Sequence, residues 1–304
     1  MRSKYILVAM LLTLVLSSAL SCQSSSSSPT ESIVVTYSIL GSIVKELVGD
    51  KATVIVSVPN GLDPHEWQPS AKAIETINKA DLVVENGLGL EASMEKTLKA
   101  AGDSGVKFFT ASDYITVRHV GSGEGIPSGD PDQVVGAPDP HLWMDPIAMK
   151  SVVSGLATVL MQDLNLDVSS HATDLENRLN SLNTEIADIV AAIPPANRKL
   201  VTGHESMGYF AQRYDFKLVG VIVPSLSTQA GDSPANLAEL KKAIEDNQVK
   251  AIFTELGTSS AVAKAIGDET GVKVVELTTH VLPSDGSYFT FMRNIASVIT
   301  NALK

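Results

Sequence analysis

The chain has 304 residues, of which 44% are hydrophobic and only 5% aromatic, and its formal net charge is −11. This length accommodates two domains of ordinary size with aliphatic cores. The acidic balance excludes nucleic acid as a partner, because no basic stripe is present to neutralise phosphates.

The N-terminus has the features of an export signal. Two basic residues precede an apolar run from Tyr5 to about Leu16, which is shorter than a typical transmembrane helix. Residues 1–21 are therefore predicted to be a signal peptide. Cys22, the only cysteine, stands at the expected cleavage point and is typical of a bacterial lipoprotein. We expect Cys22 to be lipidated and the Ser-rich segment 22–32 to be a tether. The alternative is an ordinary signal peptide with a stray cysteine.

Short apolar strands alternate with helices between residues 33 and 167, and this alternation predicts a parallel sheet covered on both faces. Ser70 is predicted to cap the helix Ala71–Lys79, and Pro146 suits the first turn of a helix that reaches about Leu164. The segment Ser112–Pro138 lacks periodicity and predicts a functional or mobile loop. The other predicted elements are strands Ile33–Tyr37, Thr53–Val58, Leu82–Glu85 and Val106–Thr110 and helices Ile39–Val48 and Leu90–Ala100.

A long helical pattern follows this first half. From about Val168 to Ile193, apolar residues recur every three or four positions on one face, and two prolines end the pattern. More than twenty helical residues span over about 30 Å, enough to cross between two domains. We therefore predict an N-terminal lobe at 33–167, a linking helix at 168–194 and a C-terminal lobe at 195–304.

Alternation of strands and helices resumes after the linking helix. The predicted strands are Lys199–Thr202, Phe216–Val223, Ala251–Thr254 and Val272–Leu277, and the predicted helices are Met207–Tyr214, Ser233–Asn247, Ser260–Thr270 and about Tyr288–Leu303. The predicted fold class is thus α/β, with two lobes that each contain a mostly parallel sheet flanked by helices and that are joined by one long helix.

Four histidines are predicted at loop positions that suit a binding site. Two of them share a repeated pattern, Asp63-Pro64-His65-Glu66-Trp67 and Asp139-Pro140-His141-Leu142-Trp143. Proline fixes its own φ and keeps the preceding residue out of helical space, so each imidazole sits on a stiff loop. His204 and His280 follow predicted strands, at the edge where open α/β sheets bind ligands.

We expect these four histidines to meet around one metal ion in the cleft between the lobes. Four neutral imidazoles suit tetrahedral zinc better than magnesium or calcium, and copper and nickel are alternatives. For any single loop histidine the competing interpretation is a solvated or structural role. His119 and His171 lack a comparable context, and we expect both to be exposed and without function.

These motifs resemble the metal-binding lipoprotein receptors of bacterial ABC importers for zinc and manganese. The resemblance runs from about Ile33 to Lys304 and rests on the two Asp-Pro-His motifs, on Gly203-His204-Glu205-Ser206 with Tyr209-Phe210, and on the linking helix. It implies delivery of the ion to an ABC permease and its ATPase, on the outer side of the cytoplasmic membrane or in the periplasm. We expect the receptor to be a monomer.

The resemblance implies that the first three loop histidines are ligands and leaves the fourth ligand open. Many members have an aspartate in the loop after the last strand, where this chain has His280, with Asp285 as the rival. Histidine at position 204 favours zinc, because manganese-type members generally have a carboxylate there and manganese prefers oxygen.

Three acidic residues are expected to support the ligands from behind: Asp145, Glu205 and Glu255. Two other functions compete with metal delivery. One is an exported zinc hydrolase with three histidines and an open water position, in which Glu205 is the only obvious general base. The other is a surface adhesin, a label sometimes attached to relatives. The chain has no His-Glu-x-x-His motif and a fourth histidine would close the coordination shell, so we expect no enzyme activity.

Overall fold

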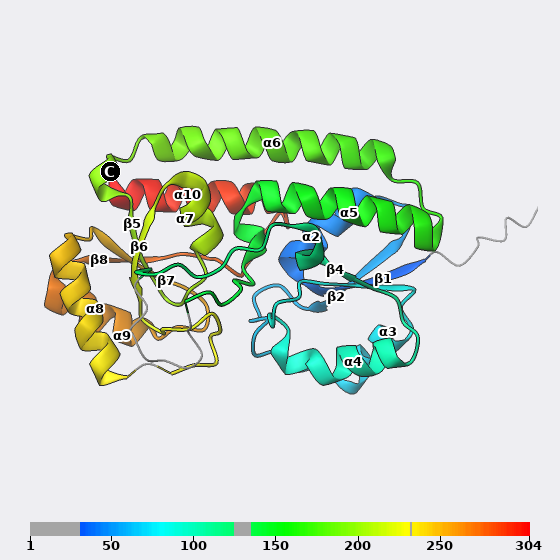
Figure 1. Ribbon diagram of the computed structural model, residues 1–304, viewed down its shortest axis with the longest axis horizontal. Helices are drawn as coiled ribbons and strands as arrows, with labels where there is room; N and C mark the ends of the chain where they lie inside the picture. Colours follow the sequence, from blue (N-terminus) through cyan, green and yellow to red (C-terminus); the bar gives the residue numbers. More distant parts are fainter. Residues whose placement is uncertain (1–30, 125–134, 232) are drawn as a thin grey trace, which may run out of the picture. The chain divides into compact units, whose positions relative to one another are not determined.

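The computed structural model describes residues 31–124, 135–231 and 233–304 (Figure 1). Glu31–Lys304 form one compact unit, within which two α/β lobes are joined by a long helix. The predicted signal peptide and Cys22 lie outside the described residues. The lobe boundaries at 167 and 195 stay a prediction.

A parallel sheet of four strands forms the centre of the N-terminal lobe: β1 (Ser32–Tyr37), β2 (Thr53–Val58), β3 (Leu82–Glu85) and β4 (Phe108–Thr110). The strand order is β2-β1-β3-β4, so the direction of winding reverses between β1 and β3. Such a reversal opens a crevice at the carboxyl ends of the strands, where open α/β sheets bind ligands.

Helices cover both faces of this sheet, as predicted. In Figure 1, α2 (Ser38–Val48) and α5 (Pro146–Leu164) lie on one face, and α3 (Ala71–Asn78) and α4 (Glu95–Asp103) lie on the other. The predicted cap is present, since the side chain of Ser70 accepts a hydrogen bond from the backbone N–H of Ala73.

The helix predicted from Leu90 to Ala100 is wrong at its start. The chain first makes a short 3₁₀ turn, Ala92–Met94, and α4 begins only at Glu95. The cause is Glu91, whose buried carboxylate accepts hydrogen bonds from the Thr36 hydroxyl and the Asn86 N–H, both at 2.7 Å. These bonds tie the chain to the ends of β1 and β3 before the helix can begin.

The C-terminal lobe contains two parallel strand pairs. β5 (Lys199–Thr202) pairs with β6 (Lys217–Val221), β7 (Ala251–Thr254) pairs with β8 (Lys273–Glu276), and β5 packs beside β7. The carboxyl ends of β5 and β7 are therefore neighbours. The helices of this lobe are α7 (Gly208–Tyr214), α8 (Pro234–Asn247), α9 (Ser260–Thr270) and α10 (Tyr288–Leu303).

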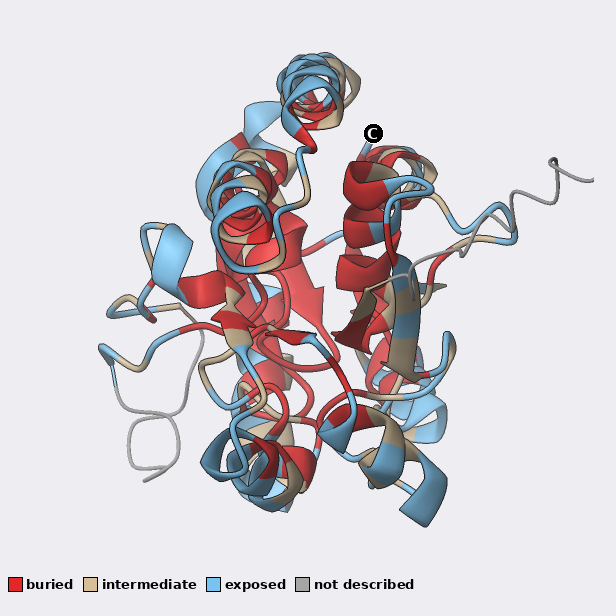
Figure 2. Cartoon of the chain, turned by 90° about the vertical axis from the view of Figure 1, so that its right-hand side faces the viewer, coloured by how far each residue is buried: buried red, intermediate tan, exposed pale blue. Residues whose placement is uncertain are grey.

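The linking helix α6 (Ser169–Ala191) packs on α5 of the first lobe and on α10 of the second (Figure 1). Its buried residues are spaced by three and four, and they form a single inward stripe: Ala172, Leu175, Leu179, Leu182, Ile186 and Val190. Figure 2 shows this stripe facing the other helices while the outer face is exposed. Among the described helices, α5 alone is long and apolar enough to cross a membrane, and its buried side packs against α6.

The two histidines assigned no function differ in exposure. His119 is exposed, as predicted, and forms an isolated antiparallel bridge with Pro138, so the 112–138 segment is not wholly irregular. Residues 125–134 of that segment lie outside the described residues. The prediction that His171 is exposed is wrong, because this residue is half-buried and its Nδ1 lies 3.0 Å from the carbonyl oxygen of Leu47. That contact gives His171 a structural role between α6 and α2.

Candidate metal centre

The four loop histidines meet in space. One ring nitrogen of each lies within 4.8 Å of the corresponding nitrogen of every other, and all four residues are at most 2% exposed: His65, His141, His204 and His280. In tetrahedral zinc sites the Zn–N bond is about 2.0–2.1 Å, which places ligand nitrogens about 3.3 Å apart. The cluster therefore has the composition of a zinc site and would contract by about 1.5 Å at its widest edge.

The repeated Asp-Pro-His sequence has a local structural meaning. The Oδ1 of Asp63 accepts the backbone N–H of His65, and the Oδ1 of Asp139 accepts the backbone N–H of His141, both at 2.9 Å. Such side-chain turns are typical of aspartate, and the intervening proline has no N–H to compete for the carboxylate. Each motif thus projects its imidazole from a backbone held by its own aspartate.

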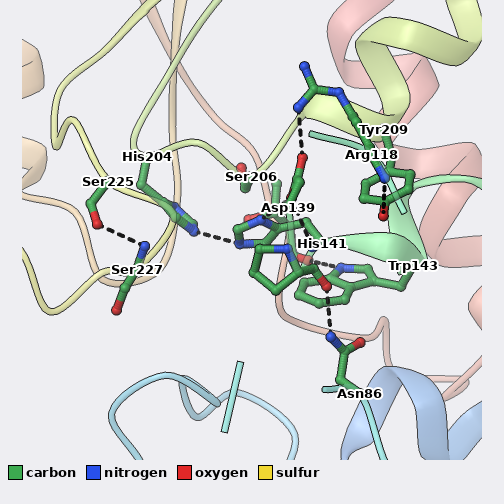
Figure 3. Close-up of polar contacts among 12 residues, drawn as sticks. Asn86, Arg118, Asp139, His141, Trp143, His204, Ser206, Tyr209, Ser225 and Ser227 are labelled. Carbon is green, nitrogen blue, oxygen red and sulfur yellow. Dashed lines mark hydrogen bonds and ion pairs between the residues drawn. The ribbon is translucent and has the colours of Figure 1, made fainter. Parts of the chain in front are cut away.

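Asp139 also sets the tautomer of His141. Its Oδ1 lies 2.9 Å from His141 Nδ1, so that nitrogen carries the proton and Nε2 presents a lone pair to the cluster. The other carboxylate oxygen, Oδ2, accepts a hydrogen bond from the Arg118 guanidinium at 3.0 Å (Figure 3). Asp139 is fully buried, so both partners stabilise its charge.

Glu255 has the corresponding position in the C-terminal lobe. It follows β7 directly, and its Oε1 accepts the backbone N–H of His204 at 2.8 Å and lies 3.0 Å from His204 Nδ1. The ring contact is close but not aligned as a hydrogen bond, so the backbone bond is the stronger restraint. Gly203 permits this approach, because a Cβ there would lie 2.7 Å from Glu255 Cγ.

His280 is oriented through a hydroxyl. Thr279 donates its hydroxyl hydrogen to Glu255 Oε2, so its oxygen accepts from His280 Nδ1 at 2.9 Å and leaves His280 Nε2 free for a metal. Trp143 of the other lobe also anchors this loop, because its indole N–H donates to the carbonyl oxygen of Thr279 at 3.0 Å. The tryptophan of the second motif therefore joins the two lobes beside the cluster.

Two of the candidate ligands lie within hydrogen-bond distance of each other. His141 Nε2 and His204 Nε2 lie 3.1 Å apart, a distance at which two lone pairs would repel and one shared proton forms a hydrogen bond. Burial acts to lower the pKa of His204, but nearby Glu255 raises it above the usual value. Burial lowers the pKa of His65, His141 and His280. Glu255 thus acts on the pKa of His204 against the effect of burial that all four imidazoles share.

Three of the other candidate residues lie away from the histidine rings. Asp285 is exposed and accepts hydrogen bonds from Ser287 N–H and the Thr290 hydroxyl at the start of α10. Asp145 caps α5 and pairs with Arg213. Glu205 is buried with its Oε1 unpartnered, and burial raises its pKa to about 8. Among the described residues, no hydrogen bond joins Asp145 or Glu205 to a histidine, and their support of the ligands stays a prediction.

Sequence reasoning missed the supporting roles of Asp139 and Thr279 while it included Glu255. The signal for Asp139 was present, because the aspartate of an Asp-Pro-His turn lies two residues before the imidazole it can reach. Asn86 was also missed. Directly after β3, its side chain donates to the carbonyl oxygen of Pro140 at 2.8 Å and accepts from the Tyr37 hydroxyl at 2.9 Å. No sequence motif marks this residue, because its partners come from distant segments.

Two α/β lobes, one linking helix and four buried imidazoles from loops define a two-lobed metal-binding protein. The chain belongs to the family described as zinc-uptake complex component A, periplasmic (ZnuA), which matches residues 33–302. This confirms the resemblance inferred from the motifs.

The names of individual relatives refer to different metals. The chain is 28% identical over 249 residues to the high-affinity zinc uptake system protein ZnuA of Bacillus subtilis, covering 81% of this chain and 77% of that one. It is 25% identical over 264 residues to the manganese-binding lipoprotein MntA of Halalkalibacterium halodurans, covering 84% and 81%. The structure of the periplasmic zinc-binding protein TroA from Treponema pallidum has the same fold, with a TM-score of 0.76 at 23% identity over 90% of this chain and 99% of that one.

Proposed function

We propose that this protein is the extracytoplasmic receptor of an ABC importer and that its cargo is zinc, held by His65, His141, His204 and His280. The observation that carries the proposal is the buried cluster of four ring nitrogens, one from each histidine. An all-nitrogen set is borderline-soft and favours zinc over manganese, which prefers oxygen ligands. Asp285 is not needed to complete four-coordination.

Two carboxylates offset the charge of the ion. Asp139 and Glu255 lie directly behind two of the imidazoles, and the pKa of Glu255, which burial would raise, is lowered to about 2 by His204. The four ligands are neutral, so these two negative charges are what make a buried dication tolerable.

We propose delivery rather than catalysis as the function of this site. A zinc hydrolase keeps one coordination position open for water and needs a general base beside it. Here the fourth position has its own imidazole, His280, whose free Nε2 belongs to the cluster. The one obvious base, Glu205, forms no described hydrogen bond to a histidine.

The partners follow from the family. We propose that an ABC permease with its ATPase receives the ion, and that the receptor acts as a monomer tethered to the outer side of the cytoplasmic membrane or in the periplasm by a lipid on Cys22. Relatives named as metal ABC transporter substrate-binding lipoproteins, from Streptococcus mutans and Lactococcus lactis, support this placement.

Metal analysis of protein purified without added metal tests the proposal. Zinc titrated into metal-free protein should saturate at one equivalent, and His204→Ala should weaken binding. The exposed His119 provides a matched control, since His119→Ala should bind zinc as the native protein does. Two tight equivalents, or native affinity in His204→Ala, would overturn the assignment. Zinc-dependent hydrolysis of ester or peptide substrates would favour the enzyme instead.

A further inference from the structure

His65 is the one candidate ligand whose ring has no hydrogen-bond partner. Both of its ring nitrogens are buried and unpartnered, whereas His141 is oriented by Asp139 and His280 by Thr279. No hydrogen bond therefore fixes the orientation of the His65 ring. The position of the His65 backbone then decides how far the ring nitrogen reaches into the cluster.

Within its own lobe, the His65 backbone is held at two points. Its N–H donates to Asp63 Oδ1, and its carbonyl oxygen accepts the Ser93 hydroxyl at 2.7 Å. These contacts leave two polar atoms available to the opposite lobe, namely Asp63 Oδ2 and the second lone pair of the His65 carbonyl oxygen.

The 225–230 loop of the C-terminal lobe fills both of these positions. Thr228 donates its hydroxyl hydrogen to Asp63 Oδ2 at 2.7 Å. The side-chain amide of Gln229 donates to the His65 carbonyl oxygen and lies 2.7 Å from the Ser93 hydroxyl. Thr228 is buried, so its bond to Asp63 is shielded from water, whereas Gln229 is exposed.

Local turns give this loop its shape. The Ser225 hydroxyl oxygen accepts the N–H of Ser227 at 3.0 Å (Figure 3), and the Ser227 hydroxyl oxygen accepts the N–H of Gln229 at 3.2 Å. Gly257 packs behind the loop at φ +81°, and a Cβ there would lie 2.8 Å from Asp63 Oδ2. The chain has thus left room for Thr228 and Asp63 to approach each other.

We propose that Thr228 and Gln229 are positioning residues that hold His65 in the metal site and so make retention of the ion depend on closure of the lobes. This inference rests on the proposed metal-binding function. The same loop, with His65 and Pro140, lines a cavity of about 400 Å³. Breaking the two contacts would therefore free the backbone of one ligand and loosen one wall of this cavity at the same time.

The test uses zinc as the probe and a Thr228→Val/Gln229→Met variant of the full chain. Both substitutions keep side-chain size while removing the hydrogen-bond donors. Residues that position metal ligands typically change affinity by about tenfold to a hundredfold. We expect zinc to leave this variant about tenfold to a hundredfold faster when a chelator is added in excess, with binding still saturating at one equivalent. The matched control, Thr158→Val/Gln162→Met on the exposed face of α5, should release zinc at the native rate.

Repeating the substitutions in a His65→Ala background separates a positioning role from a general effect on the fold. If the two residues act through His65, they should cause no further acceleration there, because contacting residues that act as a unit are not additive. Native release kinetics in the variant, or equal acceleration in both backgrounds, would overturn the inference and leave the proposed function standing. A native protein that binds no zinc would overturn both. Should the double variant fail to fold, Thr228→Val alone should still speed release, and unchanged release would overturn the inference.

Discussion

Replacing Glu255 with glutamine is expected to reverse the tautomer of one zinc ligand with almost no change in shape. The amide has one acceptor oxygen and one donor nitrogen, whereas the carboxylate accepts at both ends. If the nitrogen faces His204, it cannot accept the backbone N–H of that residue, and its own hydrogen, close to Nδ1, favours the tautomer with the imidazole proton on Nε2. If the nitrogen faces Thr279, that hydroxyl must donate to His280 Nδ1 instead, and the same reversal occurs in His280.

The expected loss of zinc affinity follows from the hydrogen bond that the substitution removes. Either orientation replaces one hydrogen bond to a charged acceptor, which is worth about 1.5–3 kcal/mol, and blocks one ligand nitrogen with a proton. Loss of a supporting residue of this kind typically weakens metal binding by about tenfold to a hundredfold, or about 1.4–2.7 kcal/mol. We expect zinc affinity of Glu255→Gln to fall within that range.

Competition with a chromophoric chelator at constant pH measures this affinity. Glu276→Gln is the matched control, because Glu276 is exposed at the end of β8 and near the same loop. The control should bind zinc with native affinity. Native affinity in Glu255→Gln would refute the reasoning, since it would mean that Glu255 does not set the proton positions of His204 and His280.

Three further predictions concern the fourth ligand, the anchor and a buried carboxyl. Zinc affinity should fall in His280→Ala and stay native in Asp285→Ala, which only loses contacts at the start of α10. Cys22→Ser should be released from the membrane fraction of the native host. Burial raises the pKa of Glu91 to about 7, above the usual 4.5. The folded protein then keeps a proton that the unfolded chain loses, so the free energy of unfolding should fall by roughly 3 kcal/mol in all as pH rises through 4.5 to 7. Urea unfolding at pH 5 and pH 8 should show most of this difference in the native protein and a smaller one in Glu91→Gln.

Each of these predictions has a contrary result. Native zinc affinity in His280→Ala together with weaker binding in Asp285→Ala would transfer the fourth ligand to the aspartate. A Cys22→Ser protein that stayed in the membrane fraction would contradict the lipid anchor. An equal pH dependence in the native protein and Glu91→Gln would show that this carboxyl does not retain a proton on folding.

The fold was largely predictable because its signals are local. Strand and helix alternation, the proline that opens α5 and the apolar stripe of α6 all act within a few residues of one another, and they placed nearly every element. The error at the start of α4 came from Glu91, whose partners lie on β1 and β3. A contact at that sequence distance leaves no trace in a local pattern.

The candidate site divides in the same way. The residue types of the four histidines and the stiff Asp-Pro-His loops are local features, so the sequence alone indicated a metal, its nitrogen ligands and their placement in loops. It could not separate Glu255 from Asp145 and Glu205, because all three are acidic residues near the ends of strands or motifs. Only the tertiary structure brings the ends of β5 and β7 together and places Glu255 behind His204. Likewise, only the approach of the two lobes sets Thr228 against Asp63, since a hydrogen bond is made in space between groups 165 residues apart.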